Sequence, residues 1–202
     1  MARKRISEIR HQELIDATIR VIHRRGYAAA TMQEIAAEAG ASAASINYYF
    51  GSKERLLAAT MRRMLGVLRA ALLERYAEAK TPRARLDAVV AANFDDRLFT
   101  RAQCSVWMQF WSFAPQSETL ARLHRINRVR VRSQFRAALR PLAPPLTRET
   151  ARAALQAYMD GVWLEAAQSE GPLHPATARR EAAKVVDLLL DARRGAAPGP
   201  EA

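Results

Sequence analysis

The sequence has few of the residues from which catalytic and metal sites are built. It holds one cysteine, Cys104, and four histidines among 202 residues. Cys104 has no partner for an intramolecular disulfide, and we expect a buried thiol because the surrounding stretch is apolar. No His or Cys pair has a metal-ligand spacing, and no phosphate-binding glycine loop or GxSxG motif is present. The sequence therefore predicts a protein that is not an enzyme and that carries no metal or cofactor.

Long apolar runs are also absent. A membrane-spanning helix needs about 18 consecutive apolar residues, and charged residues interrupt every apolar run here before that length. The basic start, MARKRISEIR, leads into no apolar signal segment. Half of the residues are nevertheless hydrophobic, which suffices for the core of one medium domain or of a small domain plus a larger one. We expect a cytoplasmic protein.

The segment over residues 31–49 has the pattern of two short helices joined by a tight turn. Thr31 and Glu34 have the spacing of a capping box, which satisfies two backbone N–H groups at a helix start. Gly40 follows the last apolar residue of this helix, where a left-handed conformation favours glycine. Ser42 is a good N-cap for a second helix directly after it. Such a pair can lay one helix across a DNA backbone and the next in the major groove.

The second helix, from Ala43 to about Tyr49, has two contrasting faces. Ile46, Tyr49 and Phe50 form the inward face, and the outward face carries Ala43, Ala44, Ser45, Asn47 and Tyr48. Small side chains let a helix enter the groove deeply, alanine methyls can contact thymine methyls, and Ser or Asn can hydrogen-bond base edges. Ser52 and Lys53 then begin a helix whose N-terminus can bind a phosphate. The alternative is an ordinary helical hairpin with small exposed residues.

This part of the chain closely resembles the N-terminal domain of the TetR family of bacterial transcriptional regulators. The matching motifs lie within roughly the first 60 residues and are LIDATIRVI (14–22), IAAEAGAS (35–42), INYYF (46–50) and SKERLL (52–57). The resemblance implies that residues 43–48 belong to the recognition helix and that three side chains contact phosphates: Thr31, Tyr48 and Lys53. Many members have tyrosine at the position of Asn47, so a phosphate contact there is lost or replaced by a base contact.

The remaining residues show helical patterns and no evident strand. Pro, Gly, Ser and Thr separate these patterns, and we expect helices over residues 82–94, 100–113, 117–142, 147–168 and 175–194. With a long helix from Lys53, this makes nine helices in an all-α, TetR-like fold. We expect a helix–turn–helix domain over 1–53, a ligand-binding and dimerisation bundle over 54–194, and a disordered tail over 195–202.

The net charge of +12 does not by itself locate a nucleic-acid site. Residues 1–53 carry eight basic and five acidic side chains, whereas residues 81–145 carry eleven and four. Part of the second excess is a row of arginines at helical spacing, at positions 122, 125, 128, 132, 136 and 140. We interpret this row as the solvated face of an amphipathic helix. The alternative is a second polyanion-binding surface, as in a protein that coats nucleic acid without sequence preference.

The last two expected helices carry large apolar faces. One holds Leu155, Met159, Val162, Trp163 and Ala166, and the other holds Val185, Val186, Leu188, Leu189 and Leu190. These faces either pack inside one subunit or form a four-helix interface between two copies. A helix–turn–helix protein usually needs two copies to span two half-sites, so the sequence favours a homodimer.

Aromatic and acidic residues in the C-terminal part suggest a binding site for a cation. Trp107 and Trp111 share a helix face, with Phe110 beside them, and Asp160 and Trp163 are neighbours on another helix. Indole faces attract a quaternary ammonium ion, and a carboxylate balances its charge without needing an N–H donor from the ligand. The alternative is that these aromatic residues simply pack in the core.

The same region resembles the C-terminal part of BetI-type repressors of the TetR family. The matching pieces are VVAANFDD (89–96), VWMQFW (106–111), ARLHRINRVRVRSQF (121–135) and YMDGVWLEAAQSEGPL (158–173). The resemblance implies a repressor of the genes for choline uptake and oxidation to glycine betaine, which choline relieves. Two alternatives remain: a TetR-type repressor of another pathway with a different effector, and a helical small-molecule-binding protein without specific DNA binding.

Overall fold

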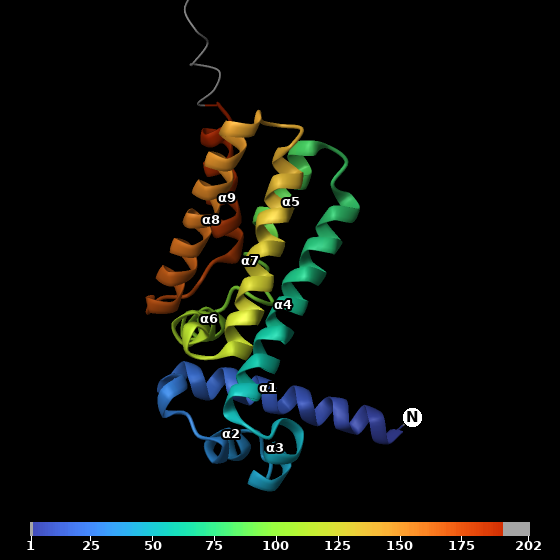
Figure 1. Cartoon of the computed structure of the whole chain (residues 1–202), viewed down its shortest axis with the longest axis vertical. Coiled ribbons are helices and arrows are strands. Elements are labelled where there is room, and N and C mark those ends of the chain that lie inside the picture. Colours follow the sequence, from blue (N-terminus) through green and yellow to red (C-terminus); the bar gives the residue numbers. More distant parts are fainter. Residues whose placement is uncertain (1, 192–202) are drawn as a thin grey trace, which may run out of the picture. The chain divides into compact units, whose positions relative to one another are not determined.

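Every regular element of the described chain is helical. The computed structural model describes residues 2–191 (Figure 1). Within them lie nine α-helices and one short 3-10 helix, η1: α1 (Ala2–Ala29), α2 (Met32–Glu38), α3 (Ala43–Phe50), α4 (Lys53–Glu78), α5 (Pro82–Ala92), α6 (Arg101–Phe113), η1 (Ala114–Gln116), α7 (Glu118–Leu139), α8 (Pro145–Gln168) and α9 (Pro175–Asp191). The predicted all-α fold with nine helices is confirmed over this range.

Helix starts follow the capping residues in the sequence. In six cases a Ser or Thr oxygen accepts the backbone N–H three residues further on, namely at Thr31, Ser42, Ser52, Thr81, Thr100 and Ser117. Several ends differ from the prediction. Helix α8 begins at Pro145 rather than Thr147, because proline is well suited to the first helical position. Helix α5 ends at Ala92 and α7 at Leu139, both earlier than expected. The tail predicted over 195–202 lies outside the described residues.

The chain forms two compact units that are not contiguous in sequence. The first takes the chain up to Gly66 together with residues 100–127 and 166–170, and the second takes residues 67–99, 128–165 and the chain from Gly171 onward. Helices α4, α7 and α8 therefore contribute residues to both units. This division differs from the predicted domain boundary at residue 53, which stays a prediction.

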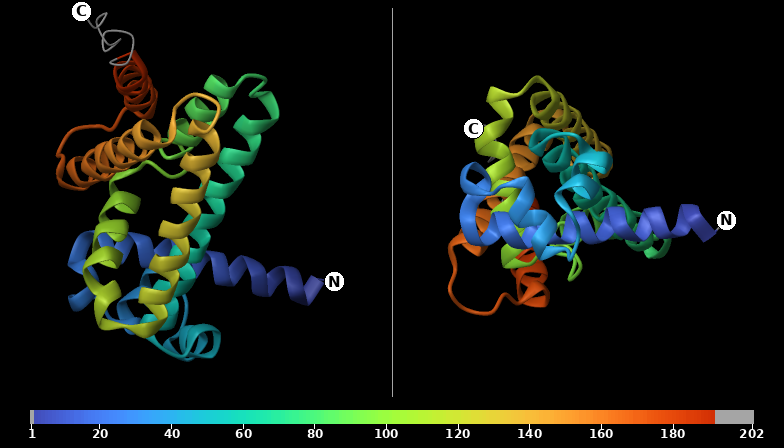
Figure 2. Two further views of the ribbon diagram at one scale, coloured as in Figure 1. Left: turned by 45° about the horizontal axis from the view of Figure 1, so that its top comes forward. Right: turned by 90° about the horizontal axis from the view of Figure 1, so that it is seen from below.

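The first unit contains the two short helices of the predicted helix–turn–helix. Helix α1 packs against α2 and α6, and α2 packs against α3. The views in Figures 1 and 2 agree in placing α2 and α3 next to α1. Fully buried Leu14, Ile35, Ile46 and Leu56 bring one side chain each from the first four helices into the core. Cys104 is also fully buried, as predicted, and burial raises the pKa of its thiol to about 12.

The second unit packs α5 against α9. A ring cluster joins the segment after α5 to α8, since Phe99 contacts Phe94 edge-on at 5.2 Å and Trp163 at 5.9 Å between ring centroids. Trp163 also donates its indole N–H to the carbonyl of Asn93 at 3.2 Å. Arg179 of α9 donates to the carbonyl of Phe94 at 2.6 Å. These contacts fix the turn that follows α5 against both C-terminal helices.

A buried carboxylate holds two arginines beside the same turn. Asp95 is only 5% exposed, and it accepts from Arg75 at 2.9 Å and from Arg97 at 2.8 Å. Arg97 also pairs with Glu74 of α4 at 2.7 Å. Burial alone would raise the pKa of Asp95, but hydrogen bonds from Arg97 and Arg75 outweigh it and bring the pKa to about 2. Asp95 therefore stays ionised and ties α4 to the turn.

The substitution Asp95→Asn should lower the free energy of unfolding at neutral pH by about 1–3 kcal/mol, because charged hydrogen bonds at a buried group are lost. The folded pKa of Asp95 lies below its ordinary value of about 3.9, so this contribution is complete above about pH 4 and disappears as the pH falls towards 2. Urea denaturation at several pH values measures both effects. Exposed Asp96→Asn is the matched control, and a stability difference that is equal at pH 7 and pH 2 would contradict the assignment.

Candidate functional site

The turn between α2 and α3 has the geometry that the sequence predicts. Thr31 accepts the N–H of Glu34 at 3.1 Å, and the Glu34 carboxylate accepts the N–H of Thr31 at 3.0 Å, which completes the capping box. Gly40 has φ of 61°, a left-handed conformation that glycine adopts without steric cost. Ser42 accepts the N–H of Ser45 at 3.1 Å and starts α3. The turn is therefore built from local interactions.

Helix α3 separates its two faces as predicted. Of the predicted inward face, Ile46 and Phe50 are buried and Tyr49 is half-buried. The Phe50 ring contacts the His11 ring of α1 at 4.7 Å between centroids. On the other face Ser45 is half-buried, and the exposed residues are Ala43, Ala44, Asn47 and Tyr48. Tyr48 is the most open of these, at 85% exposure. The residues expected to contact DNA are therefore accessible to solvent, and the DNA contacts themselves stay a prediction.

Lys53, expected from the sequence to contact a phosphate, makes its interactions inside the protein. Its ammonium donates to the carbonyls of Tyr27 at 2.8 Å, Ala28 at 3.0 Å and Ala30 at 3.0 Å. It also lies 4.7 Å from the centre of the Tyr27 ring, a cation–π contact. A lysine ammonium has three N–H donors, and all three have acceptors here. Lys53 therefore joins the start of α4 to the end of α1.

Helices α1 and α2 are joined by arginine–glutamate pairs that the sequence analysis missed. Arg20 and Arg24 donate to Glu38 at 2.6 and 2.5 Å, and Arg25 donates to Glu34 at 3.0 Å. The hydrogen bond from Arg24, followed by that from Arg20, lowers the pKa of Glu38 to about 2. No local pattern predicts these pairs, because the partners are 9 to 18 residues apart in sequence.

Helix α6 contacts the end of α1 at the same place as Lys53. The Gln109 side chain accepts the backbone N–H of Tyr27 at 3.3 Å, and the Phe113 ring meets the Tyr27 ring at 4.7 Å between centroids. Gly26, just before, has φ of 77° and interrupts α1. Tyr27 thus contacts α6 and Lys53 of α4 at once.

The aromatic residues of α6 form one cluster with α7. Trp107 lies 6.3 Å from Trp111 and 6.1 Å from Phe110, measured between ring centroids. His124 of α7 joins them, at 5.8 Å from Phe110 and 6.4 Å from Trp111. The structure thus brings together three of the five predicted ligand residues. It adds His124, which the sequence analysis did not select.

Buried polar atoms without a hydrogen-bond partner among the described residues include two on or near this cluster. They are the indole Nε1 of Trp111, in this cluster, and the amide Oδ1 of Asn127, three residues beyond His124. A buried donor or acceptor that is left unpaired costs about 1–3 kcal/mol. A ligand with a polar group could satisfy either atom.

The other two predicted ligand residues, Asp160 and Trp163, belong to the second unit. Asp160 accepts a hydrogen bond from Gln156 at 3.0 Å. Burial raises the pKa of Asp160, although the hydrogen bond from Gln156 and the charge of Arg128 partly oppose this. Trp163 is buried, and its indole N–H donates to the carbonyl of Asn93. That the two sets of residues form one site stays a prediction.

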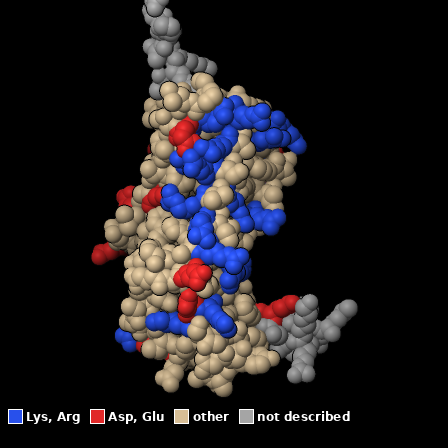
Figure 3. All heavy atoms as spheres, viewed as in Figure 1, with Lys and Arg blue, Asp and Glu red and all other residues tan. Residues whose placement is uncertain are grey.

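The arginine row of α7 lies at the surface. Figure 3 shows Lys and Arg side chains gathered over this helix and over α4, and those of α7 are exposed at positions 122, 125, 128, 130, 132 and 136. Arg132 and Arg136 each pair with Glu149 of α8 at 3.2 Å. The row agrees with the predicted solvated face of an amphipathic helix.

The described residues form neither a metal-binding cluster nor a membrane-spanning helix. No group of three His, Cys, Asp or Glu residues in this part of the chain is placed to hold a metal ion. None of the described helices combines the length and the apolar character that crossing a membrane requires.

Known families match both parts of the chain. Residues 14–60 match the family described as bacterial regulatory proteins, tetR family. Residues 82–191 match the family described as BetI-type transcriptional repressor, C-terminal. The HTH-type transcriptional regulator BetI of Burkholderia thailandensis is 41% identical over 187 residues, which are 92% of this chain and 96% of the relative. BetI of Burkholderia ambifaria is 39% identical over 184 residues, 91% of this chain and 95% of the relative.

Solved structures agree in fold. A transcriptional regulator from Pseudomonas aeruginosa PAO1 has a TM-score of 0.72 at 29% identity and covers 93% of this chain and 94% of its own. A regulator from Saccharomonospora viridis, solved in complex with choline, has a TM-score of 0.70 at 24% identity and covers 90% and 96%. The relatives are transcriptional regulators rather than enzymes, as the sequence predicts. The chain therefore belongs to the TetR family of bacterial transcriptional regulators, and its C-terminal part is of the BetI type.

Proposed function

We propose that this regulator is a cytoplasmic, homodimeric repressor that binds operator DNA through α3 and releases it when choline binds. The genes it controls would be those for choline uptake and for conversion of choline to glycine betaine. The observation that carries this proposal is the kinship with BetI regulators over nearly the whole chain. The aromatic cluster on α6 and the choline complex of the Saccharomonospora viridis regulator support the choice of effector.

DNA recognition would use the exposed face of α3 in the major groove. Ala43 and Ala44 allow close approach to the bases, Ser45 and Asn47 supply hydrogen-bonding groups, and Tyr48 can reach a phosphate. Thr31 is an exposed residue at the start of α2, its hydroxyl is hydrogen-bonded to Glu34, and it would contact a further phosphate. A single short helix reads only a few base pairs, so two copies on a palindromic operator would supply the specificity.

Exposed apolar residues on α8 and α9 support the dimer. The faces selected from the sequence are partly internal, because Leu155, Met159 and Val186 are buried within the chain. Leu164 of α8 and Leu188 of α9 are large apolar side chains that remain 46% and 69% exposed. Helices that leave such residues uncovered in a single chain are the natural interface for a second copy.

Choline would bind against the indole faces of Trp107 and Trp111, with Phe110 completing the aromatic wall. A quaternary ammonium ion has no N–H donor, so ring faces and a nearby carboxylate are its appropriate partners. Asp160, with Trp163, would supply that charge. The unpaired indole N–H of Trp111 could donate to the choline hydroxyl. Each part of the ligand would thus meet a group of matching chemistry.

Effector binding on α6 could reach the DNA-binding helices through Tyr27. Gln109 and Phe113 of α6 contact Tyr27, whose carbonyl accepts from Lys53. A ligand that moves α6 would therefore disturb the junction that fixes α1 and α4 beside the helix–turn–helix. To release DNA, choline must favour the released state, and a coupling of about 1–3 kcal/mol is typical.

The proposal is tested by a gel-shift of the purified protein on its own upstream DNA, against excess random competitor, with and without millimolar choline. We expect a specific shift that choline weakens. Trp111→Ala should raise the choline concentration at half-release by about 3- to 30-fold, because a cation–π contact is lost, while operator affinity without choline stays unchanged. Trp111→Phe keeps a ring but loses the N–H, and its choline concentration at half-release should lie between those of the parent and Trp111→Ala.

Each other outcome of this experiment has a defined meaning. A specific shift that choline does not affect would retain the regulator and assign it another effector. No specific shift would favour a helical binding protein without specific DNA recognition. An unchanged choline midpoint in Trp111→Ala would remove Trp111 from the ligand site.

Lys53→Met should weaken operator binding at all sequences without changing its salt dependence. The ammonium already donates to three carbonyls, so its loss should loosen the helix–turn–helix and lower stability by about 1–3 kcal/mol. Affinity measured over a range of salt concentrations, together with thermal melting, checks this, with exposed Lys80→Met as control. A salt slope reduced by about one, with unchanged melting, would instead support the phosphate contact predicted from the sequence.

Choline affinity should fall as the pH is lowered through the pKa of Asp160. Burial raises this pKa above its ordinary value, so the carboxylate protonates at a higher pH than an exposed one, and only the ionised form attracts the cation. Calorimetric titration of choline at a series of pH values from about 7 downward measures the effect. Asp160→Asn should bind choline weakly with a flat pH profile, whereas exposed Glu165→Gln should behave as the parent. A parent profile as flat as that of Asp160→Asn would exclude Asp160 as the counter-charge.

A further inference from the structure

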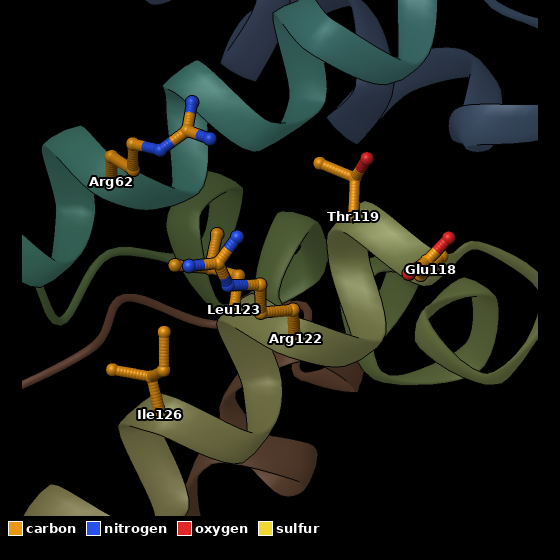
Figure 4. A pocket seen from close by; sticks show the side chains of 6 residues that line it. All are labelled: Arg62, Glu118, Thr119, Arg122, Leu123 and Ile126. Atoms are coloured by element: carbon orange, nitrogen blue, oxygen red, sulfur yellow. The ribbon is translucent and has the colours of Figure 1, made fainter.

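A cavity of about 390 Å³ lies in the first unit between α4 and the first half of α7 (Figure 4). Its lining residues are Arg62, Glu118, Thr119, Arg122, Leu123 and Ile126. None of them belongs to the aromatic cluster of α6. The residues of α7 that face the interior are others: His124 contacts the cluster, and Asn127 is buried. The cavity is therefore distinct from the site proposed for choline, and it lies within the size range of small-molecule sites.

Two arginines give this cavity its charge. Arg62 comes from α4 and Arg122 from α7, and both line the cavity (Figure 4). Neither forms an ion pair with any described residue, whereas the next residue on α4, Arg63, donates to Gln12 at 2.6 Å. Glu118, the acidic residue of the lining, lies at the far end of the view from Arg62. Two positive groups and one carboxylate therefore line this cavity, and neither arginine is paired with that carboxylate.

The start of α7 adds backbone N–H groups to this cavity, although the carboxylate of Glu118 in the same turn opposes their positive partial charge. Glu118 and Thr119 form the first turn of this 22-residue helix, which Ser117 caps by accepting the N–H of Leu120 at 3.1 Å. The N-terminal end of a helix carries partial positive charge and favours an anion. The hydroxyl of Thr119 adds a hydrogen-bond donor to the lining. The polar part of the cavity thus suits a small negative group.

The remaining lining is apolar and sets the second requirement. Leu123 and Ile126 belong to the same helix as Arg122, and Ile126 is 47% exposed although it is a large aliphatic residue. Inorganic phosphate would leave this surface in water. A ligand with a short hydrocarbon chain would cover it and gain about 25 cal/mol for each Å² of apolar surface removed from water.

We propose that this cavity binds a short aliphatic monocarboxylate. Its carboxylate lies between the guanidinium groups of Arg62 and Arg122, which are suited to planar, bidentate pairing with a carboxylate. Its hydrocarbon chain lies along Leu123 and Ile126. Binding at this site requires neither DNA nor choline, so this proposal can be tested independently of the proposed repressor function.

Calorimetric titration of the full chain with hexanoate, butyrate and inorganic phosphate, without DNA or choline, tests this assignment. Hexanoate should bind more tightly than butyrate, and phosphate should bind more weakly than either. Arg122→Gln and Arg62→Gln should each weaken hexanoate at least about tenfold, because one of the two charged partners is lost. Arg125→Gln, an exposed arginine of α7 outside the cavity, is the matched control and should bind as the parent.

A second measurement locates the bound chain. Methyl NMR of the full-length protein should show the Ile126 signal shifting on addition of hexanoate, and not in Arg122→Gln, whose circular dichroism and melting should match the parent. Equal hexanoate affinity in the parent and Arg122→Gln would overturn the proposal. So would phosphate binding as tightly as hexanoate, or hexanoate binding that leaves Ile126 unaffected.

Discussion

The ammonium of Lys53 is the interaction on which the helix–turn–helix most depends. The last carbonyls of a helix have no partner within that helix, and α1 ends beside the turn that leads to α2. Lys53 places its three donors on carbonyls at this end, and one charged group at the start of α4 therefore satisfies them together. The arginine pairs to Glu34 and Glu38 hold α2 against α1 at the surface. With these contacts, α3 is free to keep one face in the core and one in solvent.

The same junction gives the ligand site a physical route to DNA. Helix α4 begins shortly after α3 and provides one connection. A second connection exists because α6 contacts Tyr27 through Gln109 and Phe113. Gly26 interrupts the helix just before Tyr27, so this residue sits on a turn that can shift without bending all of α1. A displacement of α6 need only alter one ring contact and one hydrogen bond to reach the carbonyls that hold Lys53.

What could be predicted from the sequence was decided by interactions over a few residues. The capping oxygens of Thr31 and Ser42, the left-handed Gly40 and the buried face of α3 involve partners within one or two helical turns, and the pattern shows them directly. The hydrogen bonds of Lys53 within the protein could not be predicted, because its partners are 23 to 26 residues away in sequence. A lysine at a helix start is equally suited to binding a phosphate. His124 could not be predicted as part of the aromatic cluster for the same reason, because only the packing of α7 on α6 brings it next to Phe110 and Trp111.

Two of the residues proposed to bind the effector carry a cost for folding stability. Trp111 leaves its buried indole N–H unpaired among the described residues, and Asp160 carries a carboxyl group whose pKa is raised by burial. An apolar residue at each position would avoid these costs. Asp95 provides the contrast, since its buried carboxylate is neutralised by two arginines and its pKa is lowered. A buried acid with its counter-charge built in serves the fold, whereas the half-buried Asp160 forms no ion pair with a described residue, although the charge of Arg128 acts on it. That distinction assigns Asp95 to structure and makes Asp160 the better candidate for meeting a cation from outside.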